Sequence, residues 1–411
     1  MMRSMFSGVS GLRIHQTMMD IIGNNIANIN TVGYKTSNLT FQSMLNQTLK
    51  GASTPSAGSG GSNPIQVGLG AQMGSVDTNF VQGNLQSTGK VTDMSIQGDG
   101  FFVLRSPAGV FYTRAGNFTF DASGNLVNPA DGMIVQGWIA DAAGSINTSE
   151  SVGDLQIPID QIIEPTATTE VTYTGNLPSN AAAGDSTVTS IDVIDSLGNK
   201  HTLTINFTKT ATANLWDWAV TSPTGAAGDG HIEFDAGGLL STVTVDNAIA
   251  YTPAGADPIA ITARFGTAGT IDGLTQFSAS TTVAATSQNG NVSGGLQSMS
   301  IGGKGEITGI FSNGQNRMLG QIALASFNNA SGLLKTGNSL YSESNNSGIA
   351  VIGESNTGGR GQIISGTLEM SNVDLAKEFA NMIIAQRGFQ ANSKIITASD
   401  EMLMDLVRLK G

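Results

Sequence analysis

Cysteine is absent from this chain of 411 residues. Disulfide bonds and thiolate metal sites are therefore excluded. Long apolar runs are absent too, and no stretch reaches the ~18 consecutive apolar residues expected of a membrane-spanning helix. The N-terminus also lacks the continuous apolar core of a removable secretion signal, because polar residues interrupt it at Arg13, His15, Gln16 and Asp20. If the protein leaves the cell, we expect it to do so without such a signal.

Charge is sparse and unevenly distributed. Only 12% of the residues are charged, and the formal net charge is −12. Residues 146–284 hold three basic and fifteen acidic residues, whereas the rest of the chain holds 16 of each sign. Because the phosphates of a nucleic acid need a basic surface, the acidic excess disfavours nucleic-acid binding. A solvated outer domain is the simple interpretation of the acidic segment.

Residue patterns typical of catalytic or metal sites are missing from the sequence. The histidines have no spacing that suits a metal site, and no serine lies in a G-x-S-x-G turn. Two short glycine-rich segments, residues 98–100 and 302–305, match neither a Walker A loop nor a complete dinucleotide-binding motif. Hairpin glycines explain them better, so we predict no enzyme activity, cofactor or metal site. The histidines are His15, His201 and His231.

Two similar pentapeptides, Asp121–Asn125 and Asp195–Asn199, predict tight hairpin turns. Each places aspartate at the entry and Gly-Asn at the end, which is typical of turns. The alternating oxygen ligands of a calcium loop are missing from both. Trp216 and Trp218 alternate on a predicted strand and so share one face. Core packing is the favoured interpretation of the two tryptophans, and a binding platform is the alternative.

The middle of the chain has the pattern of a β protein. Its 53 glycines suit a structure dense in turns. Residues 95–128 and 191–207 alternate apolar and polar side chains between turns, and similar patterning resumes from about residue 285. Residues 51–64 are rich in Gly, Ser and Pro and predict a flexible segment, after which the strand signals begin.

Both ends of the chain show the seven-residue apolar period of helices that pack on one another. The first set is Met5, Leu12, Met19 and Ile26, with Val9, Gln16 and Gly23 at the intervening step. The second is Leu375, Met382, Phe389, Ile396 and Leu403, with Phe379 and Val407 as apolar companions and Gln386, Ser393 and Asp400 as polar ones. A capping box, with Ser371 as N-cap and Asp374 three residues later, predicts the start of the second helix.

These helices could pack inside one globule or against other copies of the chain. The shared period and the position at the extreme ends favour packing between copies, since a lone amphipathic terminal helix is marginal in water. We therefore expect the termini to order fully only on assembly. We call the following residues the helical seam: Met5, Leu12, Met19, Ile26, Leu375, Phe379, Met382, Phe389, Ile396 and Leu403.

Residues 10–37 resemble the N-terminal signature of the bacterial flagellar rod and hook proteins, A-N-x-x-T-x-G-Y/F-K. The matching residues are Ala27, Asn28, Thr31, Gly33, Tyr34 and Lys35. Residues 366–403 resemble the C-terminal signature of the same family. Within that family, residues 191–203, residues 320–348 and the acidic insertion are most similar to the hook members.

The resemblance implies a structural subunit rather than an enzyme. It implies export in an unfolded state by the flagellar type III apparatus and self-assembly outside the cell into a curved helical tube. Such a tube is a universal joint that transmits torque from rod to filament. The implied partners are further copies of the chain, a distal rod protein, a hook cap protein and a hook–filament junction protein, without membrane insertion. A distal rod protein of the basal body is the alternative.

The residues and the resemblance together predict a mainly β chain with long helical termini and nested, discontinuous domains. The six signature residues would form the joint where a channel-lining helix passes to the β layers. The expected parts are a coiled-coil inner tube from residues 1–30 and 371–411, a partly flexible connector at 31–70, a β-rich middle domain from 71–145 and 285–370, and an acidic outer β domain at 146–284. Both the middle and the outer domain are expected to be barrel- or sandwich-like.

Overall fold

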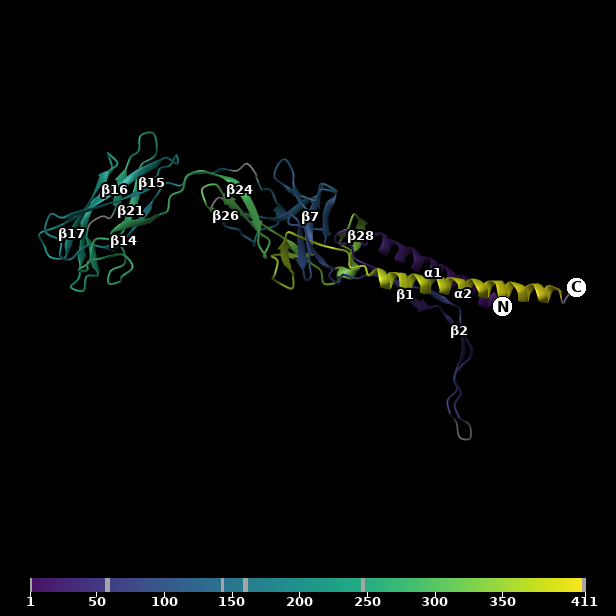
Figure 1. Cartoon of the computed structure of the whole chain (residues 1–411). Coiled ribbons are helices and arrows are strands. Elements are labelled where there is room, and N and C mark those ends of the chain that lie inside the picture. Colours follow the sequence, from purple (N-terminus) through teal and green to yellow (C-terminus); the bar gives the residue numbers. More distant parts are fainter. Residues whose placement is uncertain (1, 56–59, 142–143, 158–161, 245–247, 409–411) are drawn as a thin grey trace. The chain divides into compact units, whose positions relative to one another are not determined.

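The computed structural model describes residues 2–55, 60–141, 144–157, 162–244 and 248–408. The chain forms two compact units. Unit 1 comprises Met1–Pro158, Met299–Thr308 and Met318–Gly411, and unit 2 comprises Ile159–Ser298 and Gly309–Arg317. Strands dominate between one N-terminal and one C-terminal helix (Figure 1), which confirms the predicted class of a mainly β chain with helical termini.

Helix α1 (Met2–Ala27) ends where asparagines replace helix-forming residues. The Asn28 N–H is shared between the carbonyl oxygens of Asn24 and Asn25, both at 3.2 Å. The chain then turns at Gly33, whose φ of +67° suits glycine far better than other residues. The polar end of the N-terminal signature is therefore a helix stop.

Helix α2 (Leu375–Arg408) begins later than predicted. Asp374 is its N-cap, because Asp374 Oδ1 accepts hydrogen bonds from the N–H groups of Ala376 and Lys377 at 2.9 and 3.2 Å. The prediction that Ser371 caps the helix is wrong. Residues 370 and 372 are instead bound to partners elsewhere in unit 1: Met370 N–H donates to the carbonyl of Asn84, and Asn372 Oδ1 accepts the N–H of Thr36.

A long hairpin follows the turn after α1. Strand β1 (Ser37–Ser43) pairs antiparallel with β4 (Ala71–Thr78), and β2 (Asn46–Lys50) pairs antiparallel with β3 (Ile65–Gly68). The prediction that strands begin only after residue 64 is therefore wrong. Strand β2 is exposed along its whole length, so it shows none of the alternation between apolar and polar side chains that a half-buried strand would show. Residues 56–59 of the predicted flexible segment lie outside the described residues.

The remainder of unit 1 is built on the strand order β11-β7-β8-β29-β28. Strands β10, β12, β27, β9 and β30 extend this sheet. Two further pairs, β31–β6 and β32–β5, form separate two-stranded sheets. One cluster in its core contains Phe101, Tyr112 and Tyr341. The bounds are β5 Leu85–Ser87, β6 Met94–Gln97, β7 Phe101–Ser106, β8 Gly109–Thr113, β9 Thr119–Phe120, β10 Leu126–Val127, β11 Ile134–Ile139, β12 Gly153–Asp154, β27 Leu324–Ser326, η1 Ala330–Gly332, β28 Leu334–Gly337, β29 Leu340–Ser342, β30 Val351–Gly353, β31 Gln362–Ser365 and β32 Thr367–Glu369.

Unit 2 packs two sheets face to face over a shared core. One has the order β20-β21-β14-β22, with β23 also pairing with β14, and the other has the order β15-β16-β17-β18-β19. Both Trp216 and Trp218 are 1% exposed in this core, so core packing is confirmed for them. The bounds are β14 Glu170–Asn176, β15 Ser186–Ile194, β16 Lys200–Lys209, β17 Leu215–Ser222, β18 Asp229–Phe234, β19 Leu240–Thr244, β20 Ala248–Tyr251, β21 Ile259–Arg264, β22 Leu274–Thr275 and β23 Ala284–Gln288. The remaining strands are β13 Ile162–Ile163, β24 Gly294–Ile301, β25 Glu306–Phe311 and β26 Asn316–Ile322.

The two pentapeptide turns form as predicted. Asp195 Oδ1 accepts hydrogen bonds from the N–H groups of Leu197 and Asn199 at 2.9 and 2.8 Å. Asp121 Oδ1 accepts the equivalent pair of bonds, from the N–H groups of residues 123 and 125. In each turn the aspartate side chain thus satisfies two backbone donors, which is why the same five-residue pattern builds the same turn twice.

Candidate functional site: the helix pair and its junction with the strands

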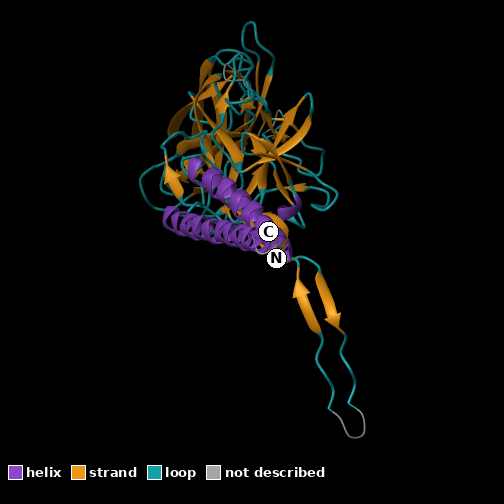
Figure 2. Ribbon diagram, turned by 90° about the vertical axis from the view of Figure 1, so that its right-hand side faces the viewer, coloured by secondary structure: helices purple, strands orange, loops and turns teal. Residues whose placement is uncertain are grey.

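Helices α1 and α2 lie side by side and run in opposite directions (Figures 1 and 2). Gly8 faces Ile396, Gly11 faces Asn392, and His15 faces Gly388. A Cβ atom on Gly11 would lie 2.7 Å from the Asn392 side chain, which is closer than side chains tolerate. The two helix backbones therefore approach closely because glycine stands at their points of contact.

One seam residue, Ile396, lies in this line of contact, opposite Gly8. The seam members Met5, Leu12, Met19, Ile26, Met382, Phe389, Ile396 and Leu403 are partly buried within the chain. Leu375 and Phe379 are exposed, at 39% and 50%. The buried residues of α2 are instead Glu378, Ala385 and Ser399. The apolar seven-residue pattern does not include these positions or the contact glycines, although residues 378, 385, 392 and 399 repeat the same period as the seam.

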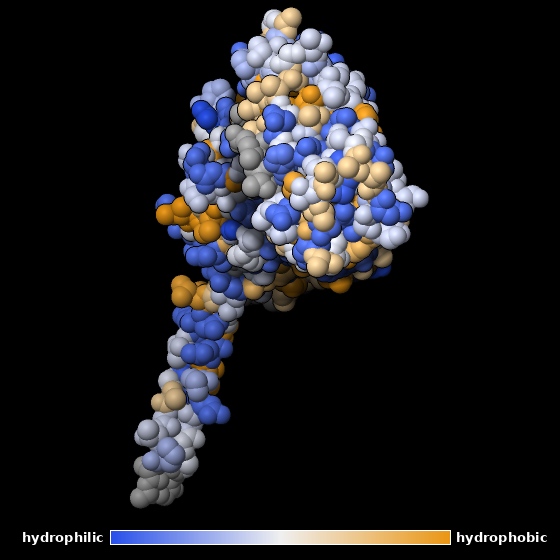
Figure 3. Space-filling model, turned by 90° about the vertical axis from the view of Figure 1, so that its left-hand side faces the viewer, coloured by the Kyte–Doolittle hydropathy of each residue, from blue (hydrophilic) through white to orange (hydrophobic). Residues whose placement is uncertain are grey.

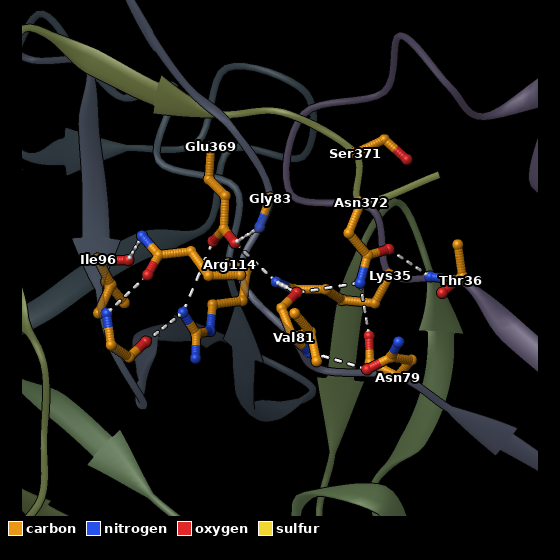
Figure 4. Close-up of polar contacts among 12 residues, drawn as sticks. Lys35, Thr36, Asn79, Val81, Gly83, Ile96, Arg114, Glu369, Ser371 and Asn372 are labelled. Atoms are coloured by element: carbon orange, nitrogen blue, oxygen red, sulfur yellow. Dashed lines mark hydrogen bonds and ion pairs between the residues drawn. The ribbon is translucent and has the colours of Figure 1, made fainter. Parts of the chain in front are cut away.

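The signature lysine is the centre of a buried ionic cluster in unit 1 (Figure 4). Lys35 Nζ donates to Glu369 Oε1 at 2.7 Å and to the Val81 carbonyl at 2.9 Å. The side chains of Lys35 and Glu369 are both 0% exposed. Glu369 Oε1 also accepts a hydrogen bond from the N–H of Gly83 at 2.9 Å. Lys35 follows the turn after α1 and Glu369 ends strand β32 before α2, so this pair ties the two chain ends together.

A second buried cation, Arg114, stands on the other side of the carboxylate. Its Nη1 lies 3.6 Å from Glu369 Oε2 and donates to the Gly98 carbonyl at 2.8 Å. Burial lowers the pKa of Lys35 and that of Arg114, while the charge of Glu369 opposes both shifts. One carboxylate thus serves two buried cations, and its loss would remove the ion-pair partner of both.

Asn372 continues the connection between the chain ends. Its Oδ1 accepts the Thr36 N–H at 2.9 Å, and its Nδ2 donates to the carbonyls of Asn79 and Val81 at 2.8 and 3.0 Å (Figure 4). This side chain supplies hydrogen-bond partners to the backbone of two separate segments, at residue 36 and at residues 79–81. Two residues before the Asp374 cap, it fixes the point at which α2 leaves the strands.

Gly33 and Tyr34 place α1 on the same cluster. Gly33 N–H donates to the Glu369 carbonyl at 2.7 Å, and a Cβ atom on Gly33 would lie 2.5 Å from Ala115 N. The Tyr34 hydroxyl lies 2.8 Å from Asn24 Oδ1 and 3.1 Å from Asn25 Oδ1. Burial raises the pKa of Tyr34, and the charge of Glu378 adds to the shift, so this hydroxyl keeps its proton as a donor.

The remaining signature residues lie at the surface of this junction. Ala27 is the exposed last residue of α1. Thr31 Oγ1 donates to Asn28 Oδ1 at 3.0 Å, and Asn28 Nδ2 donates to the Asn24 carbonyl at 2.9 Å. The structure therefore brings Gly33, Tyr34 and Lys35 into one buried contact region, whereas Ala27, Asn28 and Thr31 stabilise the helix end.

This arrangement is suited to holding elements together rather than to catalysis. In the described part of the chain, no group of three or more histidine, aspartate or glutamate side chains could hold a metal ion. Neither described helix is long and apolar enough to cross a membrane. The buried polar cluster around Lys35 and Glu369 instead fixes the two helices to the strands of unit 1.

Family models of flagellar axial proteins match most of the chain. Residues 5–35 match "Flagella basal body rod protein" and residues 95–177 match "Flagellar hook protein FlgE/F/G D1 domain". Residues 165–291 match "Flagellar basal body protein FlaE D2 domain", and residues 364–409 match "Flagellar basal body rod FlgEFG protein C-terminal". The chain is 44% identical to the flagellar hook protein FlgE of Treponema pallidum and 42% identical to that of Borreliella burgdorferi, with all of each chain covered. The chain belongs to the flagellar hook protein family.

A solved member of the hook protein family has a related fold. The crystal structure of Helicobacter pylori flagellar hook protein FlgE2 matches with a TM-score of 0.54 at 16% identity, covering 69% of this chain and 100% of that one. At this identity the likeness concerns the fold alone. The family predicted from the two terminal signatures is confirmed. Both halves of the Lys35–Glu369 pair lie in segments that match flagellar family models, 5–35 and 364–409.

Proposed function

We propose that the chain is the structural subunit of a flagellar hook, which self-assembles into a curved tube and acts as a universal joint between rod and filament. The observation that carries this proposal is full-length identity of 44% to a hook protein, together with a helix pair built from the two chain ends. The catalytic patterns sought in the sequence are missing, so we propose a structural role without catalysis.

The seam supports an inner tube made of helices. Several apolar side chains of α2 stay exposed within the chain, among them Ile383 at 58%, Ile384 at 59% and Val407 at 70%. Burial of such groups against neighbouring copies contributes roughly 25 cal/mol per Å² of apolar surface. We propose that the seam residues and these neighbours form a coiled-coil lining of the tube. The buried Lys35–Glu369 cluster then passes load from this lining to the strands.

The acidic segment supports a mobile outer layer. Residues 146–284 carry fifteen acidic and three basic residues, and most of them lie in unit 2. Exposed polar pairs contribute only about 0–1 kcal/mol each, so contacts between such surfaces break and reform easily. We propose that residues 146–284 form the outer layer, that residues 71–145 with 285–370 form the middle layer, and that residues 31–70 connect them to the inner tube.

The proposed life cycle follows from family membership and composition. We propose that the flagellar type III apparatus exports the unfolded chain and that it assembles outside the cell. Its proposed partners are further copies of itself, a distal rod protein, a hook cap protein and a hook–filament junction protein. A chain without cysteine suits such a route, because no disulfide can form before export or during passage.

Electron microscopy of the assembled polymer tests this function. The purified chain should form tubes that curve, and antibodies against it should label the segment between rod and filament in isolated flagella. Straight tubes that label only the basal body would favour the alternative, a distal rod protein. That alternative has less support, because the relatives with 44% and 42% identity are hook proteins.

A further inference from the structure

An apolar groove runs between α1 and the base of the β1–β4 hairpin. Its volume is about 500 Å³, and its apolar lining consists of Phe6, Val9, Ile14, Met44, Leu69 and Met73. Three of these side chains remain open to solvent, Phe6 at 63%, Met73 at 51% and Met44 at 39%. So much exposed apolar surface in one concave place needs an occupant.

The α2 helix of the same chain cannot be that occupant. At roughly 100° per residue, the groove residues Phe6, Val9 and Arg13 lie on the opposite side of α1 from Gly8, Gly11 and His15. The second set is the face that contacts α2. Helix α1 therefore has a second contact face, which the base of the hairpin covers only in part.

The C-terminal part of α2 has a matching unpartnered surface. Because the helices run antiparallel and Gly8 faces Ile396, Met2, six residues before Gly8, lies about level with Met402. The last residues of α2 therefore extend beyond the end of α1. Their apolar side chains are exposed, with Met404 at 51%, Leu406 at 55% and Val407 at 70%.

Charge complements this apolar match. Arg13 lines the groove and is exposed, whereas Glu401 and Asp405 are exposed on the last turns of α2. Among the described residues, no ion pair includes any of these three side chains. A helix end that carries both apolar and acidic side chains therefore fits a groove that is apolar with a basic edge.

We propose that this groove is the docking site for the end of α2, residues Asp400–Val407, from a second copy of the chain. The inference rests on the proposed function, since it names one subunit contact within the tube. It makes α1 the central layer between its own α2 and the α2 of a neighbour. The hairpin base then acts as the outer wall of a helix-binding groove.

Cysteine cross-linking tests this contact. The chain has no cysteine of its own, so only the introduced cysteines can react. The double variant Met73→Cys with Met404→Cys is assembled into tubes and treated with a short bismaleimide. We expect a ladder of covalent multimers in denaturing gels, since each copy offers both halves of the contact. The groove and α2 lie on opposite sides of α1, so linkage within one chain cannot mimic this result. A mixture of the two single variants should stop at dimers.

Three outcomes decide the matter. Tubes that form normally but stay monomeric after treatment overturn the docking site and leave the hook function intact. Cross-linking of Met73→Cys to Leu49→Cys instead, in tubes where Met404→Cys does not react, would assign the groove to a neighbour's hairpin and also overturn it. If the wild-type chain forms no tubes, the proposed function itself fails. Gln72→Cys, also on the groove, replaces Met73→Cys if that variant does not assemble.

Discussion

Lys35 Nζ lies 2.7 Å from Glu369 Oε1, although 334 positions of sequence separate the two residues. One residue follows the N-terminal helix and the other precedes the C-terminal helix, so a single ion pair closes the chain's two ends on each other. Because both side chains are buried, neither charge can be solvated by water if its partner is lost, so each residue needs the other. The helices consequently leave the β framework from one fixed place.

Replacing Lys35 with methionine should loosen this junction. The substitution leaves Glu369 with Arg114 alone, and breaking a buried pair costs roughly 3–5 kcal/mol. Hydrogen–deuterium exchange should show faster exchange of the segments around residues 33–36 and 369–372. Lys90→Met is the matched control, because the Lys90 side chain is 51% exposed and its pair with Asp93 spans 3.7 Å. It should cost about 1 kcal/mol or less, and equal effects of the two variants would refute the role given to the cluster.

The close contact of the two helices at glycine predicts that two Gly→Ala variants differ in stability. Gly388→Ala places a methyl group against the His15 ring, whereas a Cβ atom on Gly23 would meet no atom of the described residues within 4 Å. Both changes gain the same helix propensity, about 1 kcal/mol, but only the first overpacks an interface, at a cost of roughly 1–3 kcal/mol. Tubes of Gly388→Ala should therefore melt below tubes of Gly23→Ala. Melting is followed by far-UV circular dichroism, and identical curves would mean that the helices do not meet through this glycine in the tube.

Removal of residues 375–411 should separate assembly from folding. The deletion takes away α2 and its seam residues but keeps Glu369, Asn372 and the Asp374 cap. We expect a soluble monomer whose β units stay folded, because neither β core described above includes residues of α2. Circular dichroism and analytical ultracentrifugation measure the two properties. Unfolding of the β units in the truncated chain would show that α2 is part of their core after all.

The ends and turns of this chain could be predicted from the sequence because their determinants are local. A seven-residue period predicts both helices, and Asp195 bonds to N–H groups within four residues of itself. The predictions were wrong where contacts distant in sequence decide the local structure. Ser371 and Asp374 both look like caps, and only the distant partners of residues 370–372 decide between them.

The junction itself could not be predicted in the same way. The signature identified Lys35, but nothing near it in sequence names Glu369 or Arg114 as its partners. Hairpin strands β2 and β3 could not be predicted either, because their apolar residues Leu49 and Ile65 are exposed at 57% and 54% and follow no burial pattern. Figure 3 shows hydrophobic residues exposed among hydrophilic ones on this projecting hairpin. A strand that is exposed on both faces has no buried face, so its sequence carries no alternation from which the strand could be predicted.

Acid should weaken unit 2 through Asp195. Burial alone would raise the pKa of Asp195, but hydrogen bonds from His201, Asn199 and backbone N–H groups overcome it and lower the pKa from 3.8 to about 2. The ionised side chain therefore adds stability above pH ~4, on the order of 1–2 kcal/mol, which is lost as the pH falls through the folded-state pKa. Fluorescence of the buried Trp216 and Trp218 reports unfolding of this unit. In Asp195→Asn the loss between pH 4 and 2 should shrink, and an unchanged acid transition would exclude this aspartate as its source.

Salt should stiffen the assembled tube if negative charge keeps the outer layer mobile. Repulsion between acidic surfaces acts over about 10 Å at 0.1 M salt and over about 3 Å at 1 M. Added salt therefore permits closer contact between neighbouring acidic units. Asp229→Asn with Asp257→Asn removes two exposed charges whose side chains make no hydrogen bond or ion pair with the described residues, so it should reduce the salt response without disturbing the fold. Bending stiffness is measured from the curvature fluctuations of single tubes. A stiffness that ignores salt in the wild-type chain would mean that the outer layer moves for reasons other than charge.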